Sequence, residues 1–509
     1  MDWELLADQP LGQKLIKKWF WLYFFMIISA PVAYIIKVII SNTLSVEEVG
    51  VFYSVYWLMV LVAIYNDLWL TESLQYFLPK YRLEKKYNNC KTIILLSLWA
   101  QLILGTGIAI AMYFWADRLA TNHFHAESAA QVIRNLCFYF IGINIIQVLG
   151  WIYYSFQDVT RYSWIEFAKV YTILWFTLFF WLGRWLTLDN FSIAWILGIL
   201  WGIITGILLF GKKYRKILTH GNFIWDKKLI KTQLKYALRV FLSANAWTIL
   251  VQIDQQLIIN LLGPASAGYF TNYLSMIMAY TVISVPILSL SFPIISEIIA
   301  KKEYPKLKIL QDTLYKYFSV FALSIWWLFV ALWPEIMTVF FGQKFLPSGE
   351  LLKYAWPFLI INILFVINFS ILAGTGKVKQ RAGILLIWLI ATVGSMITFI
   401  KFFERWLVGA VLWTVLGWIV LWILSFKIVN KIQKITFNWW FLIKNVATIG
   451  AICIGIWFIK DQYFILEDIH RYTNLWYLAI IGIIYYGIIA GINYPSLKLL
   501  KKEVKELRK

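Results

Sequence analysis

The sequence has little charge for its length. Of its 509 residues, 14% are charged and 61% are hydrophobic, whereas a soluble domain carries roughly 25% charged residues. Apolar runs recur from end to end, each long enough to cross a hydrocarbon core of roughly 30 Å. Lipid offers the backbone no hydrogen-bond partners, and the runs show no period-two alternation. We therefore predict an all-α integral membrane protein rather than a β-barrel.

Cysteine, histidine and catalytic motifs are also scarce. The three cysteines, at 90, 137 and 453, show no pair spacing, so neither a disulfide framework nor a metal site is indicated. His123 and His125 could hold a metal, but two histidines in a short polar loop favour simple solvation. No phosphate-binding Gly-x-x-x-x-Gly-Lys-Ser/Thr loop occurs, and we expect no cofactor. No loop carries an Asp/Glu/His cluster for acid–base work, which disfavours a membrane polymerase or sugar transferase.

About fourteen spans are predicted, with both termini in the cytoplasm. The spans lie near residues 19–41, 50–70, 92–115, 135–156, 163–183, 191–211, 240–262, 268–292, 317–333, 354–373, 382–400, 407–426, 441–459 and 475–493. With the N-terminus inside, cytoplasmic segments hold 35 of the 47 Lys and Arg residues and outer loops hold 9. The positive-inside rule predicts this bias, and an omitted span would invert the alternation after it.

The net charge of +21 is therefore first a sign of membrane orientation. The basic residues lie in short loops beside the membrane, where attraction to anionic lipids accounts for them, so we predict no nucleic-acid partner. The acidic outer loop at 460–474 is interpreted as solvated.

The chain repeats itself at an offset of 218 residues. Residues 44–52 match residues 262–270, and each segment closes one span and opens the next. The same offset places Arg161 on Lys379, both in loops. Because the offset covers six spans, the halves are parallel repeats, an arrangement in which transporters hold the substrate between their halves. We predict a six-helix lobe at 1–216, a second at 217–430, and two further helices with a basic cytoplasmic tail at 431–509.

Several short motifs, in this order and spacing, resemble those of bacterial polysaccharide-transporter flippases. They lie at residues 44–50, 66–72, 77–79, 252–254, 262–269, 292–296 and 373–377. These flippases form the oligosaccharide-lipid branch of the superfamily that also contains the multidrug and toxin extrusion antiporters.

The resemblance implies two six-helix lobes around a V-shaped cavity. It also implies export of a polyprenyl-pyrophosphate oligosaccharide across the cytoplasmic membrane for cell-surface polysaccharide biosynthesis, by alternating access and without ATP. Partners would be the lipid-linked substrate, membrane lipids, and a polysaccharide polymerase or glycosyltransferases. An ion-coupled multidrug antiporter on the same fold is the alternative.

Tryptophan is unusually frequent, at 29 residues against 27 glycines. Members of the family that this chain resembles usually have glycine where this chain has Trp69 and Trp406. Two explanations stay open. The protein is simply rich in aromatic residues, or some of its Trp codons are stop codons that the organism reads as Gly and that were translated as Trp under the wrong genetic code.

Charged side chains within spans mark the first candidate residues, since burying them costs about 2.5–3.5 kcal/mol on insertion scales. Lys37 lies near the outer end of the first span, where either a cavity cation or a lysine snorkelling to the interface fits. Asp254 lies too deep in the seventh span for its short side chain to reach water. Ion coupling and a hydrogen bond to a neighbouring helix both explain it, while Glu166 and Lys169 are spaced to pair with each other.

A polar stripe and a basic residue complete the predicted substrate path. One face of the seventh span carries Asn245, Thr248, Gln252 and Gln256, and Asp254 points nearly opposite. Gln255 is the repeat partner of Lys37 and flanks this stripe. Arg239 opens the span at its inner mouth, where guanidinium suits a pyrophosphate. Asp67 and Glu72, at the inner end of the second span, are further ion-coupling candidates.

Overall fold

The structure is a computed structural model, and every regular element in the part of the chain that it describes is helical. It describes residues 11–279 and 303–494, apart from short gaps at 64–65, 67–69, 157, 376, 403–405, 433, 435–437 and 468–469, together with residues 295, 298, 299 and 496. Side chains within these helices are described except over residues 11–23 and 236–251 and at a smaller number of positions elsewhere.

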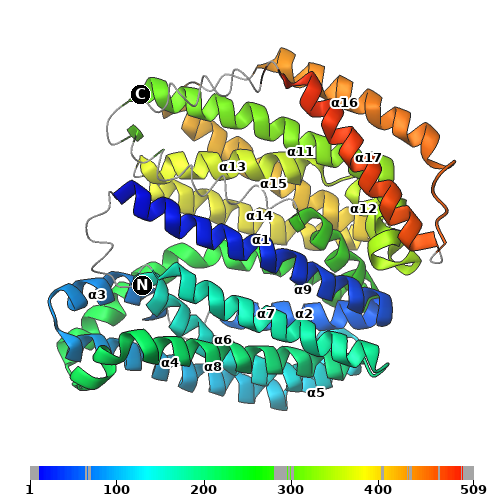
Figure 1. The fold of residues 1–509 in the computed structure, drawn as a ribbon. Coiled ribbons are helices and arrows are strands. Elements are labelled where there is room, and N and C mark those ends of the chain that lie inside the picture. The colour runs from blue at the N-terminus through cyan, green and yellow to red at the C-terminus, as the bar shows by residue number, and fades with distance from the viewer. Residues whose placement is uncertain are drawn as a thin grey trace. The chain divides into compact units, whose positions relative to one another are not determined.

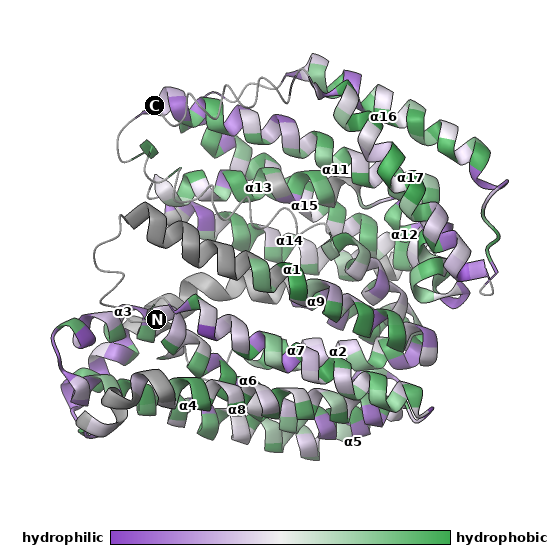
Figure 2. Cartoon of the chain, in the orientation of Figure 1, coloured by the Kyte–Doolittle hydropathy of each residue, from purple (hydrophilic) through white to green (hydrophobic). Residues whose placement is uncertain are grey.

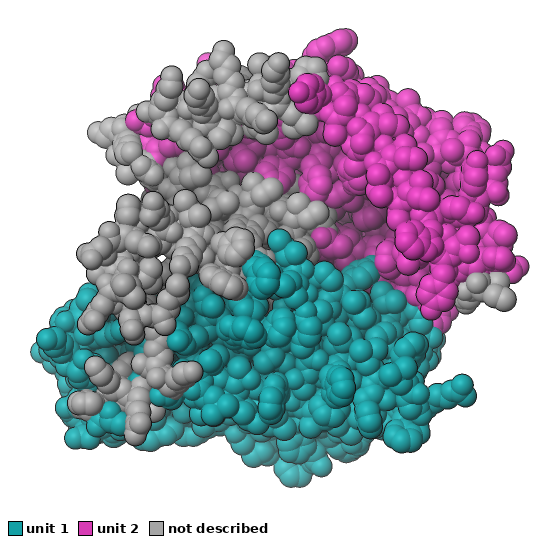
Figure 3. All heavy atoms as spheres, in the orientation of Figure 1, with its two compact units in different colours: residues 1–268 teal, residues 269–509 magenta. Residues whose placement is uncertain are grey.

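The chain divides into two compact units, Met1–Gly268 and Tyr269–Lys509, which Figure 3 distinguishes by colour. The predicted lobe boundaries at 216/217 and 430/431 follow from the internal repeat. A division into compact units does not test a repeat, so these boundaries stay a prediction.

Unit 1 is built from long helices that pack lengthwise. They are α1 (Leu11–Thr43), α2 (Val46–Val62), α3 (Leu70–Leu83), α4 (Tyr87–Phe114), the short α5 (Ala116–Leu119) and η3 (Ala120–Phe124), α6 (Ser128–Ser155), α7 (Val159–Leu182), α8 (Leu188–His220) and α9 (Lys227–Ala279) as far as Gly268. Within the unit, α8 packs against both α6 and α7, and α1 packs against α7 (Figure 1).

Unit 2 has the same construction. Its helices after α9 are α11 (Tyr304–Phe341), η4 (Gln343–Phe345), α12 (Leu346–Leu352), α13 (Trp356–Gly374), α14 (Val378–Phe402), α15 (Trp406–Ile432), α16 (Trp439–Lys460) and α17 (Arg471–Ile492). Here α15 packs against α13 and α14, and α11 carries both α16 and α17 (Figure 1). The last two helices, which lie outside the internal repeat, are thus attached through α11.

Nine helices of the described chain are long and apolar enough to cross a membrane. They cover the predicted third to sixth, ninth and eleventh to fourteenth spans. Two shorter apolar helices, Ile27–Thr43 and Leu359–Gly374, cover the predicted first and tenth. The second, seventh and eighth predicted spans fall on segments that are only partly described. Apolar residues dominate the middle of the long helices, and polar ones gather toward their ends (Figure 2).

Candidate functional site

The two repeated segments meet in unit 1. Ser45 caps α2 in a capping box with Glu48, so the helix starts within the first repeated segment, four residues before the predicted span. Gly50 then lies so close to α9 that an added Cβ would come 2.0 Å from the Pro264 carbonyl oxygen and 2.6 Å from the nitrogen of Gly268. Gly50 and Gly268 are equivalent under the 218-residue offset. Each repeat therefore supplies a glycine that lets the two helices approach backbone to backbone.

α9 changes direction just before this junction. Gly263 has φ +83°, a backbone conformation that side-chain-bearing residues rarely adopt, and Pro264 follows it. These two residues set the angle at which Gly268 reaches α2.

Lys37 is buried in unit 1 with no hydrogen bond to its ammonium group from any described residue. The side chain is 4% exposed, and Nζ lies 3.3 Å from the centroid of the Tyr53 ring. A ring face attracts a cation, and the attraction contributes about 2 kcal/mol when both groups are desolvated. This is less than a carboxylate partner would contribute. The side chain therefore does not snorkel to the surface of this unit, and it keeps capacity for an anion.

Gln255, the repeat partner of Lys37, lies next to the same part of α2. Its Nε2 donates to Ser54 Oγ at 2.9 Å and to the Ala267 carbonyl at 3.2 Å. Lys37 and Gln255 thus approach the adjacent residues Tyr53 and Ser54. The sequence predicted the equivalence of the two positions but not that both side chains contact the same turn of α2.

A second polar group, which we call the His123 cluster, consists of Ser54, His123, His125, Gln256 and Asn260. Gln256 Nε2 donates to the Ser54 carbonyl at 2.8 Å, and its Oε1 lies 3.0 Å from His123 Nε2. Asn260 Nδ2 lies 3.2 Å from His123 Nδ1, and His125 Nε2 lies 2.9 Å from the Asn260 carbonyl. His125 is exposed, as expected of a polar loop, and His123 is half-buried. The sequence did not predict that α9 supplies both with partners that are distant in the chain.

The remaining candidates are only partly described. Gln252 and Asp254 are buried, each 8% exposed. Arg239, Asn245 and Thr248 lie on α9, and Glu72 lies on α3, where the side chains are outside the described part. Asp67 lies outside the described residues. Their predicted roles stay predictions.

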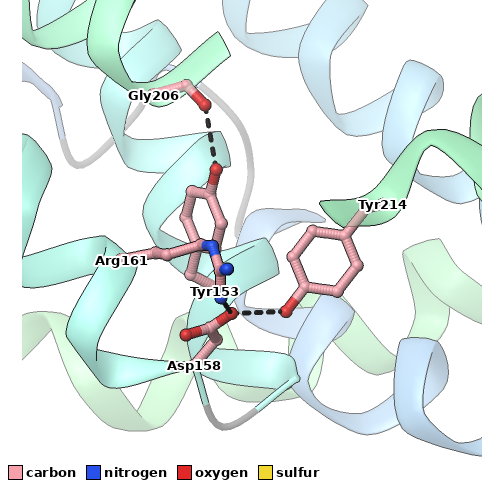
Figure 4. A network of polar contacts seen from close by, with 5 residues as sticks. All are labelled: Tyr153, Asp158, Arg161, Gly206 and Tyr214. Carbon is pink, nitrogen blue, oxygen red and sulfur yellow. Dashed lines mark hydrogen bonds and ion pairs between the residues drawn. The ribbon is translucent and has the colours of Figure 1, made fainter. Parts of the chain in front are cut away.

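A charged network, the Asp158 network, joins α6, α7 and α8 (Figure 4). The Asp158 carboxylate accepts from Arg161 at 2.5 Å and from the Tyr214 hydroxyl at 2.9 Å, while Tyr153 donates to the Gly206 carbonyl. Burial, and then the Asp158 carboxylate, raise the pKa of Tyr214, so its hydroxyl stays a donor. Arg161, predicted as a loop residue at the cytoplasmic face, is committed to this network.

Hydrogen bonds connect the linker before α9, and the first turns of α9 itself, to α3 and α4. Lys91 Nζ donates to the Gly221 carbonyl at 2.9 Å, and Gln233 Nε2 donates to the hydroxyls of Ser73 at 2.9 Å and Ser97 at 3.2 Å. These bonds hold the beginning of α9 to the first repeat.

Unlike Lys37, the half-buried Lys169 and the buried Lys460 have carboxylate partners. Lys169 pairs with Glu166 at 2.5 Å, as their spacing predicts. In unit 2, Lys460 at the end of α16 pairs with the buried Glu335 of α11 at 2.9 Å. The expectation that the whole loop 460–474 is solvated is therefore wrong at Lys460 and at Asn474, which is buried and donates to the Ile465 carbonyl at 2.7 Å.

The chain is similar to known membrane proteins over nearly its whole length. The polysaccharide biosynthesis protein family matches residues 15–299. An uncharacterized membrane protein of Methanocaldococcus jannaschii is 24% identical over 97% of this chain and 98% of its own length.

Solved structures share the fold. The inward closed conformation of the lipid II flippase MurJ is 15% identical and matches 94% of this chain and 99% of its own with a TM-score of 0.70. The inward-facing conformation of a multidrug resistance MATE family transporter is 17% identical and matches 84% of this chain and 95% of its own with a TM-score of 0.64.

The family match spans more than half of the chain, so the chain belongs to the polysaccharide biosynthesis protein family. Its fold is shared by the lipid II flippase MurJ and by the MATE family transporter. The predicted all-α membrane class and family resemblance are confirmed, and the chain is a multi-pass membrane protein.

Proposed function

We propose that this membrane protein exports a lipid-linked oligosaccharide with a polyprenyl-pyrophosphate headgroup by alternating access across the cytoplasmic membrane. The observation that carries the proposal is Lys37. Its ammonium group is buried, and no carboxylate or hydrogen-bond acceptor among the described residues offsets its charge. A buried charge without a partner is costly, and a pyrophosphate would supply the missing counter-charge. A cationic drug would add to the positive charge instead.

The substrate path of the proposal includes Gln252 and Gln256 from α9, with Arg239, Asn245 and Thr248 along the same helix. Amides can bind sugar hydroxyls as donors and acceptors, and the arginine can bind phosphate oxygens in bidentate fashion. Lobes at 1–216 and 217–430 would enclose the path, with both termini in the cytoplasm. A polymerase or glycosyltransferases would act on either side of the transport step.

Reconstituted protein tests the cargo directly. Proteoliposomes should translocate a fluorescent polyprenyl-pyrophosphate oligosaccharide, and the uncharged polyprenol bearing the same dye should move more slowly. Transport of organic cations without movement of the pyrophosphate lipid would instead establish the antiporter function that the MATE-like fold also permits.

A further inference from the structure

The amides of the His123 cluster have a defined orientation. Gln256 Nε2 is fixed by the Ser54 carbonyl, so its Oε1 must face His123 Nε2. Asn260 Nδ2 lies 3.4 Å from the carbonyls of Asn122 and His123, which only an amino group can approach favourably, so the atom that faces Nδ1 is a donor and not the amide oxygen. His123 in this arrangement is neutral, with its proton on Nε2.

Protonation of His123 conflicts with these bonds. The added proton would be on Nδ1, facing the amino group of Asn260, so that two donors would point at each other. Turning the Asn260 amide around would place its oxygen against the carbonyls of Asn122 and His123 instead. Either rearrangement weakens the cluster, whereas His125 donates from Nε2 to the Asn260 carbonyl in both of its charge states.

Neighbouring elements carry several other titratable groups. Asp117 on α5 pairs with Arg134 of α6 at 2.6 Å, and Arg118 and Glu127 beside them are exposed. Asp254 lies two residues before Gln256 on α9, and two helical steps place it on the opposite face. The donor conflict at Nδ1 is therefore specific to His123 within this part of unit 1.

The cluster also joins the two repeats. Ser54, His123 and His125 belong to the first, and Gln256 and Asn260 lie on the helix that opens the second. The Gly50–Gly268 approach lies on the same stretch of α2 and α9. The predicted topology places residues 116–134 and 262–268 on the outer side. If the protein alternates between inward-open and outward-open states, these contacts must separate each time the substrate path opens to the outside.

We propose that the His123 cluster is an outer latch whose release is driven by an external proton that binds to His123. The inference rests on the alternating access of the proposed function and names the proton as its coupling ion. Histidine changes charge between about pH 5 and 8. One proton taken up on opening changes the open-to-closed ratio by up to about tenfold per pH unit.

Spin labels at Thr121→Cys and Ser266→Cys would report the latch without any substrate. Pulsed electron resonance on the full-length protein in lipid nanodiscs should show one short distance at pH 8 and a growing longer population toward pH 5.5. His123→Gln, which cannot take up a proton, should remove this pH response. His125→Gln is the matched control and should retain it.

A variant with the opposite expectation guards against misfolding. Asn260→Asp offers protonated Nδ1 an acceptor, but it sets a carboxylate oxygen against neutral Nδ1 and against the carbonyls of Asn122 and His123. The longer population should therefore be larger at pH 8 than at pH 5.5, the reverse of the unaltered protein. An unchanged distance between pH 8 and 5.5, or a response that survives His123→Gln, would overturn the proposal. Because the measurement needs no cargo, a pH response in a protein that fails to move the pyrophosphate lipid would refute only the proposed function.

Discussion

The Asp158 network and the His123 cluster hold unit 1 together in different ways. The first is ionic and links helices of one repeat, with Asp158, Arg161 and Tyr214 as its members. The second is neutral and links the first repeat to the helix that opens the second. The Asp158 network contains no histidine, the side chain that changes charge between about pH 5 and 8. The comparison suggests a permanent clamp within a lobe and a separable contact between the repeats.

The assignment of loops to the inner and outer sides of the membrane can be tested by chemical labelling, with an all-or-none result. Single cysteines at Asn122 and Gln462 should react with an impermeant thiol reagent added outside intact cells, and cysteines at Lys228 and Lys431 should not. The native cysteines are buried and give a low background. The reverse pattern would place the His123 cluster on the cytoplasmic side and end its role as an outer latch.

Substitutions in the Asp158 network, the clamp, should give the largest change in stability. Asp158→Ala leaves Arg161 and Tyr214 without their acceptor, and breaking a buried pair costs about 3–5 kcal/mol. Arg161 is a quarter exposed, so we expect the lower end, seen as a reduced Tm in detergent. Tyr214→Phe, which loses one hydrogen bond, should cost about 1 kcal/mol.

The clamp should also be insensitive to pH over the range that opens the latch. The pKa of Tyr214 is raised by burial and by the Asp158 carboxylate. Its contribution to stability is therefore complete below the ordinary tyrosine value of about 10 and is lost only as the pH rises through the folded value. The Tm difference between the unaltered protein and Tyr214→Phe should be equal at pH 5.5 and 7.5, and a difference confined to one of them would contradict this assignment.

Gly50→Ala should break the contact between the repeats. The new methyl group would meet backbone atoms of Pro264 and Gly268 that cannot turn aside, and overpacking of this kind costs about 1–3 kcal/mol. The longer spin-label distance should then appear even at pH 8. Gly107→Ala is the control, because nothing lies within 4 Å of its added Cβ. A closed latch in Gly50→Ala would show that the close approach is dispensable.

The smallest effect is expected at Asp254. If His123 binds the coupling proton, Asp254→Asn should leave the pH dependence of the latch distance unchanged. Loss of that dependence would transfer coupling to Asp254, the other explanation that the sequence leaves open.

Most of the fold follows from the sequence because spans are local features. Apolar runs fix the helices, and the repeat matches Gly50 with Gly268. Contacts between distant segments are not encoded locally. The sequence marked Lys37 as a charge within a span but could not show that its neighbour is Tyr53, and it interpreted His123 as solvated because Gln256 and Asn260 are more than 130 residues away.

The Trp question is only partly accessible. Trp388 and Trp418 are buried against each other, with ring centroids 4.9 Å apart, and so have a packing role. The side chains of Trp69 and Trp406 lie outside the described part. Sequencing the gene decides the matter, since TGG at both codons would end the reassignment explanation.

The central claim, that an unpaired buried cation receives an anionic headgroup, is tested most directly by exchanging Lys37 while measuring flipping of the pyrophosphate lipid in proteoliposomes. Lys37→Ala should abolish flipping and Lys37→Arg should retain much of it, with both proteins inserted at normal levels. The double variant Glu166→Gln with Lys169→Gln removes a lysine that already has a partner, and it should keep flipping. Full flipping by Lys37→Ala would contradict the account and leave Arg239 and the polar face of α9 as the candidates for headgroup binding.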